Sequence, residues 1–573
     1  MIRAIKLIIT TIILLAFIGL YGQKSELSIK WSEMQEYNHK AEGYFDNIIG
    51  SNSKYIYTIN NIAQNKRFRN NNKLKIVAFD KNSMQKISDV GIKGFKENEA
   101  DNKLLDDMYV QKYVIFEDVI YVFWTHESRE KDELFVQSFS NKLKIIAPLK
   151  KIYEVKSKKG DKKKAELLVL GTSNQHVLIG GELSAGKDEN IKLSIKVLKS
   201  DLTFFSSKQV TLPITSLGHK SNSLSSEYVL GDNNVLYAFS YIKMTKEQKQ
   251  LLKDNESSVY CLFSAINIED GTIQSVKLKY ENKNIYNISY HNDKDNMILT
   301  GFFSDLNKDG SMGVFKIKFN KNNLTAMSEP SFSYFTPQHI HEITKGQKKN
   351  TKKKKKRKPN IDRLLEYSLV KSFNNNGNIT FIYTIYHEYS VTTCNSKGSC
   401  TTRYYQKNSD ILAFSITRSG EINWVSKTER QAFYKGWGFY DVNVVDRDGF
   451  YYVVYADDYI FNTEKNQRVK NPKKLRQTTI NYLVLNSEDG EMVTNMHITN
   501  TMKEPPKTRK YVTAHKIIES DNELYVNSIK IKMKPQAIGI SIILIPTLYG
   551  AYLPSIITSS FTGTGYLGKI EIK

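Results

Sequence analysis

Two short stretches of the chain carry side chains of the kind that bind metal ions. The segment 305–311 (DLNKDGS) starts like a calcium loop, but Lys316 stands where the bidentate glutamate of such a loop belongs. His339 and His341 in QHIHE would share one face of a strand, yet the sequence offers no third ligand for them. We therefore predict an ordinary long turn at 305–311, and no metal ion and no other cofactor at either stretch.

Local motifs for catalysis give no candidate either. The sequence contains no GxSxG, HExxH or complete P-loop pattern. Asp457 and Asp458 are adjacent, so on a strand they would face opposite sides. Carboxylates from distant parts of the chain could still converge. We therefore name no catalytic residue, and an enzyme is the less favoured interpretation.

A run of basic residues is the strongest charged feature of a chain whose net charge is +24. Such a block repels itself and should form a disordered loop at about 344–362 that attracts polyanions. No aromatic residues alternate with the lysines to stack bases, which argues against nucleic acid. The alternatives are a solvated loop without a ligand and contact with a polyanionic cell surface. The candidate residues are Lys352, Lys353, Lys354, Lys355, Lys356 and Arg357.

An aromatic cluster at 433–440 (FYKGWGFY) gives a second candidate binding surface. It could form a platform for sugar rings, with Trp437 and Tyr440 as contacts. The favoured alternative is packing between repeated units of the fold.

The segment 537–560 carries no charged residue and is long enough to cross a bilayer. Pro546, Gly550 and Pro554 interrupt it, so we predict no transmembrane span. An apolar loop at about 535–562 should pack against the fold or plug its centre. The alternative is a docking surface for a partner.

The first 22 residues have the pattern of an export signal. Arg3 and Lys6 precede an apolar stretch, and a cleavage site is expected before Gln23. Export to the periplasm, cell surface or medium would permit a disulfide. Cys394 and Cys400 flank NSKGS and could close the tip of a hairpin, or they could remain separate thiols. Cys261 lies in an apolar run and is expected to be buried.

A strand-and-turn repeat is the element that must position these segments. Polar turns rich in Asn, Asp, Ser and Gly precede eight runs that are typical of buried strands. The runs are KYIYTI from 54, VIYVFW from 119, HVLIGG from 176, VLYAFS from 235, MILTGF from 297, ITFIYT from 379, FYYVVY from 450 and LYVNSI from 524.

Each run is followed by a strand, a turn and another strand, as in LFSAINIEDGTI and YLVLNSEDGEMV. With one strand before the first turn, a unit holds four antiparallel strands. Repeated around an axis, such units form an all-β fold, a β-propeller. We predict a single domain over 23–573 with eight blades, or seven if one unit is not a true blade. The segment 27–31 (LSIKW) should supply the strand that completes the last blade.

The long insertions should gather on one face of this propeller. If the strands of a blade are named a to d outward from the centre, b–c and d–a connections lie on one face, and a–b and c–d turns on the other. The long connections all belong to the first face, including a short helix expected where Thr245 and Gln248 match a capping box. Insertions on one face of a repeat protein often mark its binding face.

Parts of the chain resemble the secreted, largely uncharacterised propeller-like proteins of Bacteroidota. The likeness lies in ILTGFFSDLNKDGSMGVFKIKF (298–319), in SDILAFSITRSGEINWVSKTERQ (409–431) and in a leader that ends in YGQ. It implies the fold and the export of the protein, but no activity.

Two functions are consistent with these observations. The first is a binding or scaffolding propeller at the cell envelope, whose loop-rich face contacts a protein or glycan. The second is a secreted carbohydrate-active enzyme with acidic residues at the central channel.

Overall fold

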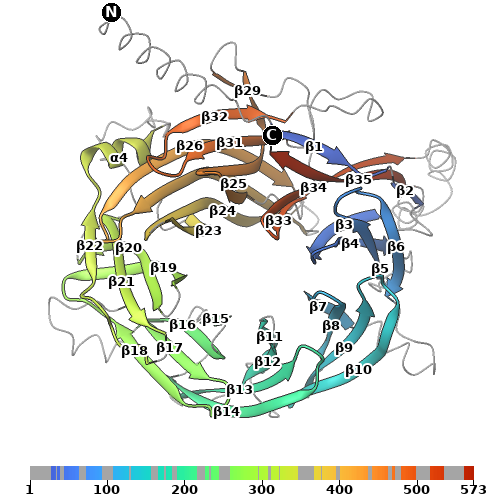
Figure 1. The fold of residues 1–573 in the computed structure, drawn as a ribbon, viewed down its shortest axis with the longest axis horizontal. Coiled ribbons are helices and arrows are strands. Elements are labelled where there is room, and N and C mark those ends of the chain that lie inside the picture. The colour runs from blue at the N-terminus through green and yellow to red at the C-terminus, as the bar shows by residue number, and fades with distance from the viewer. Residues whose placement is uncertain are drawn as a thin grey trace, which may run out of the picture.

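The computed structural model forms a ring of eight four-stranded sheets around a common centre (Figure 1). It describes residues 27–33, 35–38, 44–63, 72–92, 108–127, 131–156, 166–172, 176–183, 190–215, 226–231, 234–243, 259–293, 296–306, 311–321, 323–345, 367–375, 377–394, 400–435, 442–462, 467–470, 479–498, 516–533 and 561–572.

The first four blades follow one another along the chain. Blade 1 consists of β3 (Tyr44–Ser51), β4 (Tyr55–Ala63), β5 (Asn72–Asp80) and β6 (Lys86–Ile92). Blade 2 consists of β7 (Met108–Ile115), β8 (Val119–Glu127), β9 (Lys131–Ser140) and β10 (Ile145–Lys156). Blade 3 consists of β11 (Glu166–Thr172), β12 (His176–Leu183), β13 (Asn190–Lys199) and β14 (Phe204–Thr215). Blade 4 consists of β15 (Ser226–Leu230), β16 (Val235–Lys243), β17 (Val259–Asn267) and β18 (Ile273–Leu278).

The last four blades complete the ring. Blade 5 consists of β19 (Lys283–Asp293), β20 (Asn296–Asp305), β21 (Gly313–Asn320) and β22 (Ser331–Tyr334), followed by the helix α4 (Pro337–Thr344). Blade 6 consists of β23 (Tyr367–Asn375), β24 (Asn378–Cys394), β25 (Cys400–Ile416) and β26 (Ile422–Lys435). Blade 7 consists of β27 (Asn443–Arg447), β28 (Phe450–Asp457), β31 (Thr479–Asn486) and β32 (Met492–His497), with the hairpin β29 (Tyr459–Asn462) and β30 (Gln467–Lys470) inserted. Blade 8 consists of β33 (Lys516–Ser520), β34 (Glu523–Met533), β35 (Phe561–Ile572) and β1 (Leu27–Trp31), and β2 (Gln35–Asn38) also pairs with β35.

These pairings confirm the predicted fold and the count of eight blades. Each of the eight apolar runs forms the second strand of its blade. The runs are apolar along their length, as in β28 with its pattern of seven consecutive buried residues, because both sides of an inner strand are covered. Neighbouring blades supply that cover, since each of the eight hydrophobic clusters lies between two successive blades.

The N-terminal strand closes the ring, as predicted. β1 runs antiparallel to β35, with Leu27 opposite Ile572 and Trp31 opposite Gly568. Gly568 is required here because a Cβ at this position would come within 2.6 Å of Ile29 Cγ2. The segment 563–568 (GTGYLG) has the GxGxxG spacing of some phosphate-binding turns, but it lies within β35 and no helix follows it. The closing strand leaves β35 paired on both sides.

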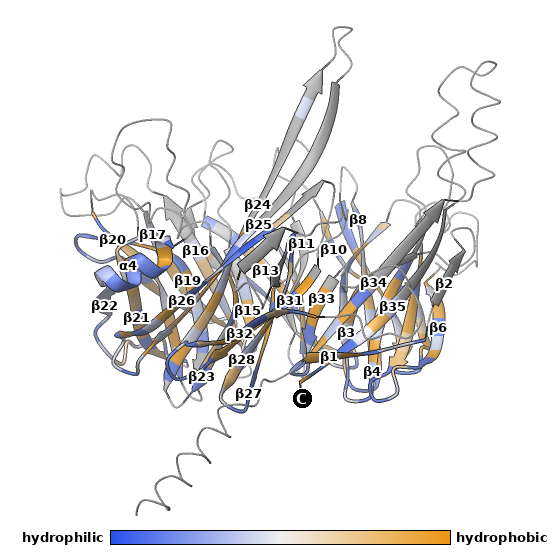
Figure 2. Ribbon diagram, turned by 90° about the horizontal axis from the view of Figure 1, so that it is seen from above, coloured by the Kyte–Doolittle hydropathy of each residue, from blue (hydrophilic) through white to orange (hydrophobic). Residues whose placement is uncertain are grey.

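The connections differ between the two faces, which we call the turn face and the loop face. The a–b connections on the turn face have two to four residues, and the c–d connections have four or five except the ten of 321–330. On the loop face, by contrast, connections occupy 244–258, 498–515 and 534–560. In Figure 2 the turn face is the lower one, where hydrophilic turns end the strands, and α4 lies on the upper side. The predicted gathering of long connections on one face is confirmed.

His339 and His341 lie in the helix α4, so they do not share a face in the way that they would on a strand. Pro337 stands in the first turn, and the Thr336 hydroxyl accepts a hydrogen bond from His339 N at 3.2 Å. His339 Nδ1 accepts in return from Thr336 N at 3.3 Å, which completes a capping box. Burial lowers the pKa of His339, in keeping with a neutral, hydrogen-bond-accepting ring.

Several other predicted features lie outside the described residues. They are the signal segment 1–22, most of the basic loop, the apolar loop 537–560 and the helix expected near Thr245 and Gln248. Over the part of the chain that is described, no helix has the length and apolar character to cross a membrane. Cys261 is fully buried, as expected.

Candidate functional site on the turn face

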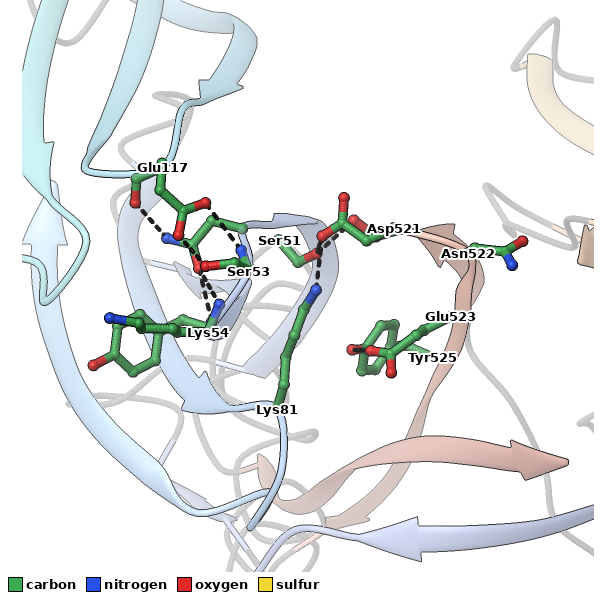
Figure 3. A network of polar contacts seen from close by, with 12 residues as sticks. Ser51, Ser53, Lys54, Lys81, Glu117, Asp521, Asn522, Glu523 and Tyr525 are labelled. Carbon is green, nitrogen blue, oxygen red and sulfur yellow. Dashed lines mark hydrogen bonds and ion pairs between the residues drawn. The ribbon is translucent and has the colours of Figure 1, made fainter. Parts of the chain in front are cut away.

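A hollow of about 920 Å³ opens on the turn face, where blades 8, 1, 2 and 3 meet. Its walls are the a–b turns of blades 8, 1 and 2 and the c–d turns of blades 1 and 3. The lining side chains are Ser51, Asn52, Ser53, Lys81, Asn82, Ile115, Phe116, Glu117, Asp118, Val119, Tyr121, Ser200, Asp201, Asp521, Glu523 and Lys569. Figure 3 shows the polar part of this wall, where residues from three blades point toward one another.

Asn52 sets the shape of the central turn. Its Oδ1 accepts hydrogen bonds from the backbone of Lys54 at 3.0 Å and Tyr55 at 2.8 Å, so the side chain takes the place of a backbone turn. Its Nδ2 donates to Glu117 O at 2.8 Å, which ties blade 1 to blade 2. The polar turn that ends a strand in the sequence therefore also links two neighbouring blades by a hydrogen bond.

Lys81 and Asp521 form an ion pair between blades 1 and 8. Lys81 Nζ lies 2.7 Å from Asp521 Oδ2, and Ser51 Oγ donates to the same carboxylate oxygen at 2.8 Å. The Lys81 side chain is 7% exposed, whereas that of Asp521 is 56% exposed. Burial tends to raise the pKa of Asp521, but the hydrogen bonds from Lys81 and Ser51 outweigh it and lower the pKa. The carboxylate is thus ionised and turned partly toward solvent.

Glu117 completes the contact with blade 2. Its carboxylate accepts from Ser53 Oγ and, at 3.2 Å, from Ser53 N. These hydrogen bonds lower the pKa of Glu117. Because the residue is exposed in the a–b turn of blade 2, its charge faces the hollow.

Glu523 lies beside the same wall in a separate group. Its carboxylate accepts hydrogen bonds from Tyr525 OH and from Lys569 Nζ. Burial raises the pKa of Tyr525, and burial would also raise that of Glu523 if the two donors did not lower it. The phenol is thus a stable donor and the carboxylate stays charged.

The hollow is acidic within a strongly basic chain. Five carboxylates line it, against the amines of Lys81 and Lys569. The pKa values of Glu117, Asp201, Asp521 and Glu523 are all lowered, the shift at Asp201 coming from the hydroxyl and N–H of Thr203. A general acid at neutral pH requires the opposite shift. These four carboxylates are therefore suited to accept hydrogen bonds or to pair with cations.

None of the sequence-predicted binding residues is among the described side chains that line this hollow. Lys352 to Arg357, Trp437 and Tyr440 lie outside the described residues, in connections of the loop face. Cys394 and Cys400 are directly opposite each other in the β24–β25 pairing, a register that brings two Cα atoms within the range of a disulfide. The disulfide itself stays a prediction.

Three residues that the sequence analysis weighed for metal binding or catalysis have hydrogen-bond partners within the fold. Asp305 ends β20 and accepts from Lys283 Nζ at 2.5 Å and from Tyr334 OH at 2.9 Å. Lys316, in β21, donates to the carbonyl oxygens of Thr417 and Arg418 in blade 6. Asp457 is 1% exposed and accepts from the backbone of Gln431 and Tyr459. Among the described residues, no group of three His, Cys, Asp or Glu side chains could hold a metal ion.

The residues of the hollow were missed because each turn was interpreted by itself, as the end of a strand. The sequence contains a pattern that could have identified them. Equivalent a–b turns carry the polar segments Ser51-Asn52-Ser53, Glu117-Asp118 and Asp521-Asn522. In a propeller, equivalent turns of successive blades come together.

Comparison with known proteins finds distant likenesses to solved structures. No protein-family model and no curated protein matches the chain. The β-propeller domain of the Trilobed protease from Pyrococcus furiosus is 11% identical, with 81% of this chain and 99% of that one covered and a TM-score of 0.32. The WD40 domain of SCAP from fission yeast is 7% identical, with 94% of this chain and 98% of that one covered and a TM-score of 0.34. The phage phi92 endosialidase is 9% identical, with 88% of this chain and 74% of that one covered and a TM-score of 0.30. At these values the likenesses carry no argument about function, and the propeller is established by the strand pairing itself.

Proposed function

We propose that the protein is an exported binding or scaffolding propeller of the cell envelope that contacts a protein or glycan through its loop face. The carrying observation is the unequal length of the connections on the two faces. A rigid ring with insertions confined to one face is a common design for binding, because the loops vary while the core holds them in place. The basic run and residues 436–440 of the aromatic cluster both belong to segments of the chain that connect strands at that face.

The proposal also includes export from the cell and a relation to secreted propeller-like proteins of Bacteroidota. The charged start and apolar stretch of residues 1–22 support removal of a signal peptide before Gln23. The likeness to secreted propeller-like proteins of Bacteroidota supports the same location. Mass spectrometry of the N-terminal peptide from the native protein tests this step, and a mature chain that retains residues 1–22 would contradict it.

Affinity purification from the native cells tests the binding role. The tagged protein should retain a stoichiometric envelope component, and deletion of 537–560 should release it if the apolar segment is the contact. A control deletion within the connection 244–258 should retain it. A protein recovered alone under gentle conditions would contradict stable scaffolding.

A secreted carbohydrate-active enzyme is the second candidate. The acidic hollow favours it, since ionised carboxylates can hold sugar hydroxyls or serve as nucleophiles. The lowered pKa values of Glu117 and Asp521 count against either of them as the general acid. Glycan hydrolysis that is lost in Glu117→Gln or Asp521→Asn would establish the enzyme and displace the scaffold.

A further inference from the structure

A tyrosine at the third position of a blade's second strand ties neighbouring blades together. Tyr57 of β4 donates its hydroxyl proton to Asn141 O, in the c–d turn of blade 2, at 3.0 Å. Tyr237 of β16 makes the same kind of bond to Lys321 O, in the c–d connection of blade 5, at 3.4 Å. Both tyrosines are almost completely buried. In blades 1 and 4 the phenol therefore links a blade to the next one in the ring.

Tyr121 holds the equivalent position in blade 2 but lacks this bond. It is the third residue of β8 and is only 4% exposed. Its ring belongs to the hydrophobic cluster between blades 2 and 3 and meets the ring of Phe116 edge-on, with the centroids 5.9 Å apart. Among the described residues, however, its hydroxyl has no hydrogen-bond partner. A polar group buried to this degree normally has one.

The Tyr121 hydroxyl lies at the hollow on the turn face. Tyr121 is one of the side chains that line this hollow, together with Ser200 and Asp201 from the c–d turn of blade 3. This is the turn that Tyr121 would bind if blade 2 followed the pattern of blades 1 and 4. Burial and, to a lesser degree, the negative charge of Asp201 raise the pKa of Tyr121, so the phenol is neutral and near that carboxylate. The hydroxyl is therefore directed into the hollow and not at the backbone of the next blade.

Three carboxylates that line the hollow have no ion-pair partner among the described residues. They belong to Glu117 and Asp118, in the a–b turn of blade 2, and to Asp201. Neighbouring hydroxyl and N–H donors do most to lower the pKa values of Glu117 and Asp201, and the charges of Lys54 and Lys199 add a smaller part without forming ion pairs. The two amines that line the hollow are paired with its other two carboxylates. The hollow therefore keeps an excess of negative charge.

The distribution of this charge favours an extended organic cation over a metal ion. Within the described part of the chain, no three acidic, histidine or cysteine side chains are placed to hold one metal ion. The walls come from turns of four blades, and a volume of about 920 Å³ is in the range of small-molecule sites. A flexible chain with several ammonium groups can reach separate carboxylates at once, and each ammonium group has N–H donors for both a carboxylate and a hydroxyl. Its methylene groups could pack against Phe116, which also lines the hollow.

From these observations we infer that the hollow binds a linear aliphatic polyamine, with its ammonium groups on Glu117, Asp118 and Asp201. One ammonium group donates to the hydroxyl oxygen of Tyr121 beside Asp201, and the methylene groups pack on Phe116. Hydrogen bonds between an ammonium group and a carboxylate are among the strong ones in proteins. The site lies on the turn face, opposite the loops of the proposed function. It is thus a second binding site and does not depend on that function.

Calorimetric titration of the full chain with spermidine tests the inference. Tyr121→Phe removes the hydroxyl but keeps the ring in its cluster, and it should weaken binding about tenfold because a hydrogen bond with an ammonium group is lost. The matched control Tyr237→Phe removes the equivalent hydroxyl of blade 4, outside the hollow, and should leave the Kd unchanged. Tyr121→Phe should also melt at the temperature of the native protein, since the fold itself loses no hydrogen bond.

A second matched pair of variants tests the carboxylates. Asp201 and Asp270 stand in equivalent c–d turns of blades 3 and 4. Each accepts hydrogen bonds from the N–H and the hydroxyl of the threonine two residues further on, but only Asp201 lines the hollow. Asp201→Asn should weaken the binding of spermidine about tenfold and reduce its dependence on salt, whereas Asp270→Asn should change neither.

Several results would overturn the inference. An unchanged Kd in Tyr121→Phe, or a lower melting temperature of this variant, would show that the hydroxyl does not serve a ligand. Equal losses in Asp201→Asn and Asp270→Asn would show that binding is not at the hollow. Binding of Ca²⁺ or butylamine as tight as that of spermidine would exclude a polyamine site, and so would binding of oligolysine without binding of spermidine. None of these outcomes touches the loop face, which the affinity purification tests separately.

Discussion

Lys81 and Asp521 are 440 residues apart in the chain, and their side chains form an ion pair of 2.7 Å that joins the first blade to the last. Lys81 is almost completely buried, while its partner is half exposed. The pair lies on the wall of the acidic hollow, beside the interface where the ring closes. One contact therefore belongs both to the architecture and to the candidate site.

The pair makes stability depend on pH in a defined direction. Because the pKa of Asp521 is lowered in the folded state, its contribution is complete above the unfolded pKa of about 4 and is lost as the pH falls through the folded value. Asp521→Asn should destabilise the protein by about 1 kcal/mol at pH 7, a modest value because solvent screens the carboxylate. Thermal melts between pH 7 and pH 3 should show the difference from the native protein shrinking toward acid.

Two further variants control this experiment. Asp448 forms an ion pair with Arg447 in which both side chains are more than half exposed. Asp448→Asn should therefore have little effect on stability at any pH. Lys81→Met should be milder than Asp521→Asn, because it leaves no buried amine without its partner. Equal stability of Asp521→Asn and the native protein at pH 7 would show that the pair contributes nothing.

Gly490 and Gly449 form a matched pair of turn glycines in blade 7. Both have positive φ, at 70° and 81°, but a Cβ on Gly490 would lie 2.3 Å from the ring of Trp424, whereas nothing lies within 4 Å of one on Gly449. Gly449→Ala should cost about 1 kcal/mol of backbone strain. Gly490→Ala should cost a further 1–3 kcal/mol, roughly, because the buried indole must move. Chemical denaturation of both variants measures the difference, and equal costs would contradict the predicted contact.

The closing strand should be necessary for stability. Ile29 is 7% exposed and packs in the cluster between blades 7 and 8. Ile29→Ala should destabilise the protein by about 2–4 kcal/mol. Lys30→Gln alters an exposed hydrogen bond to Asn82 O and the attraction of the amine to the carboxylate of Asp80, so it should cost far less. Removal of residues 27–31 would leave β35 with a free edge. This edge should promote association of protein molecules, which light scattering would detect. Full stability after removal of 27–31 would show that the ring does not need this strand.

The hairpin cysteines should form a disulfide in the exported protein. Their direct opposition in the ladder predicts that the native chain is lighter by two hydrogen atoms than the reduced chain. Intact mass measured with and without reductant, after alkylation of free thiols, tests this. Cys394→Ser and Cys400→Ser should each abolish the difference, while Cys261→Ser should not. Alkylation of both hairpin thiols in the exported protein would contradict the bond.

The repeat could be predicted from the sequence because burial in this fold is local in the chain. The run 450–455 (FYYVVY) has no charged residue and only apolar and aromatic side chains, so we expected an inner strand covered on both sides. The segment 27–31 was predicted to close the ring because the last unit lacked a fourth strand. In each case a short stretch of sequence was sufficient to predict the strand and its place in the blade.

The hollow could not be predicted in the same way. Its side chains come from turns that are distant in the chain, and no local pattern says that Lys81 reaches Asp521 rather than solvent. The helix α4 was missed for a different reason. The segment QHIHE was considered only as a possible pair of metal ligands, whereas Thr336 and Pro337 ahead of it provide the start of a helix.

The closure of the ring has a consequence for how the protein is made. Strand β1 is synthesised before every other described strand, yet its partner β35 is synthesised after all of them. Bringing these ends together carries the largest loop-closure entropy in the molecule, so it should be a late step in folding. Until then a nearly complete ring would expose the edge of β35 and the adjoining apolar surface of blade 7. Such an intermediate is the form in which the chain would need protection from aggregation while it folds.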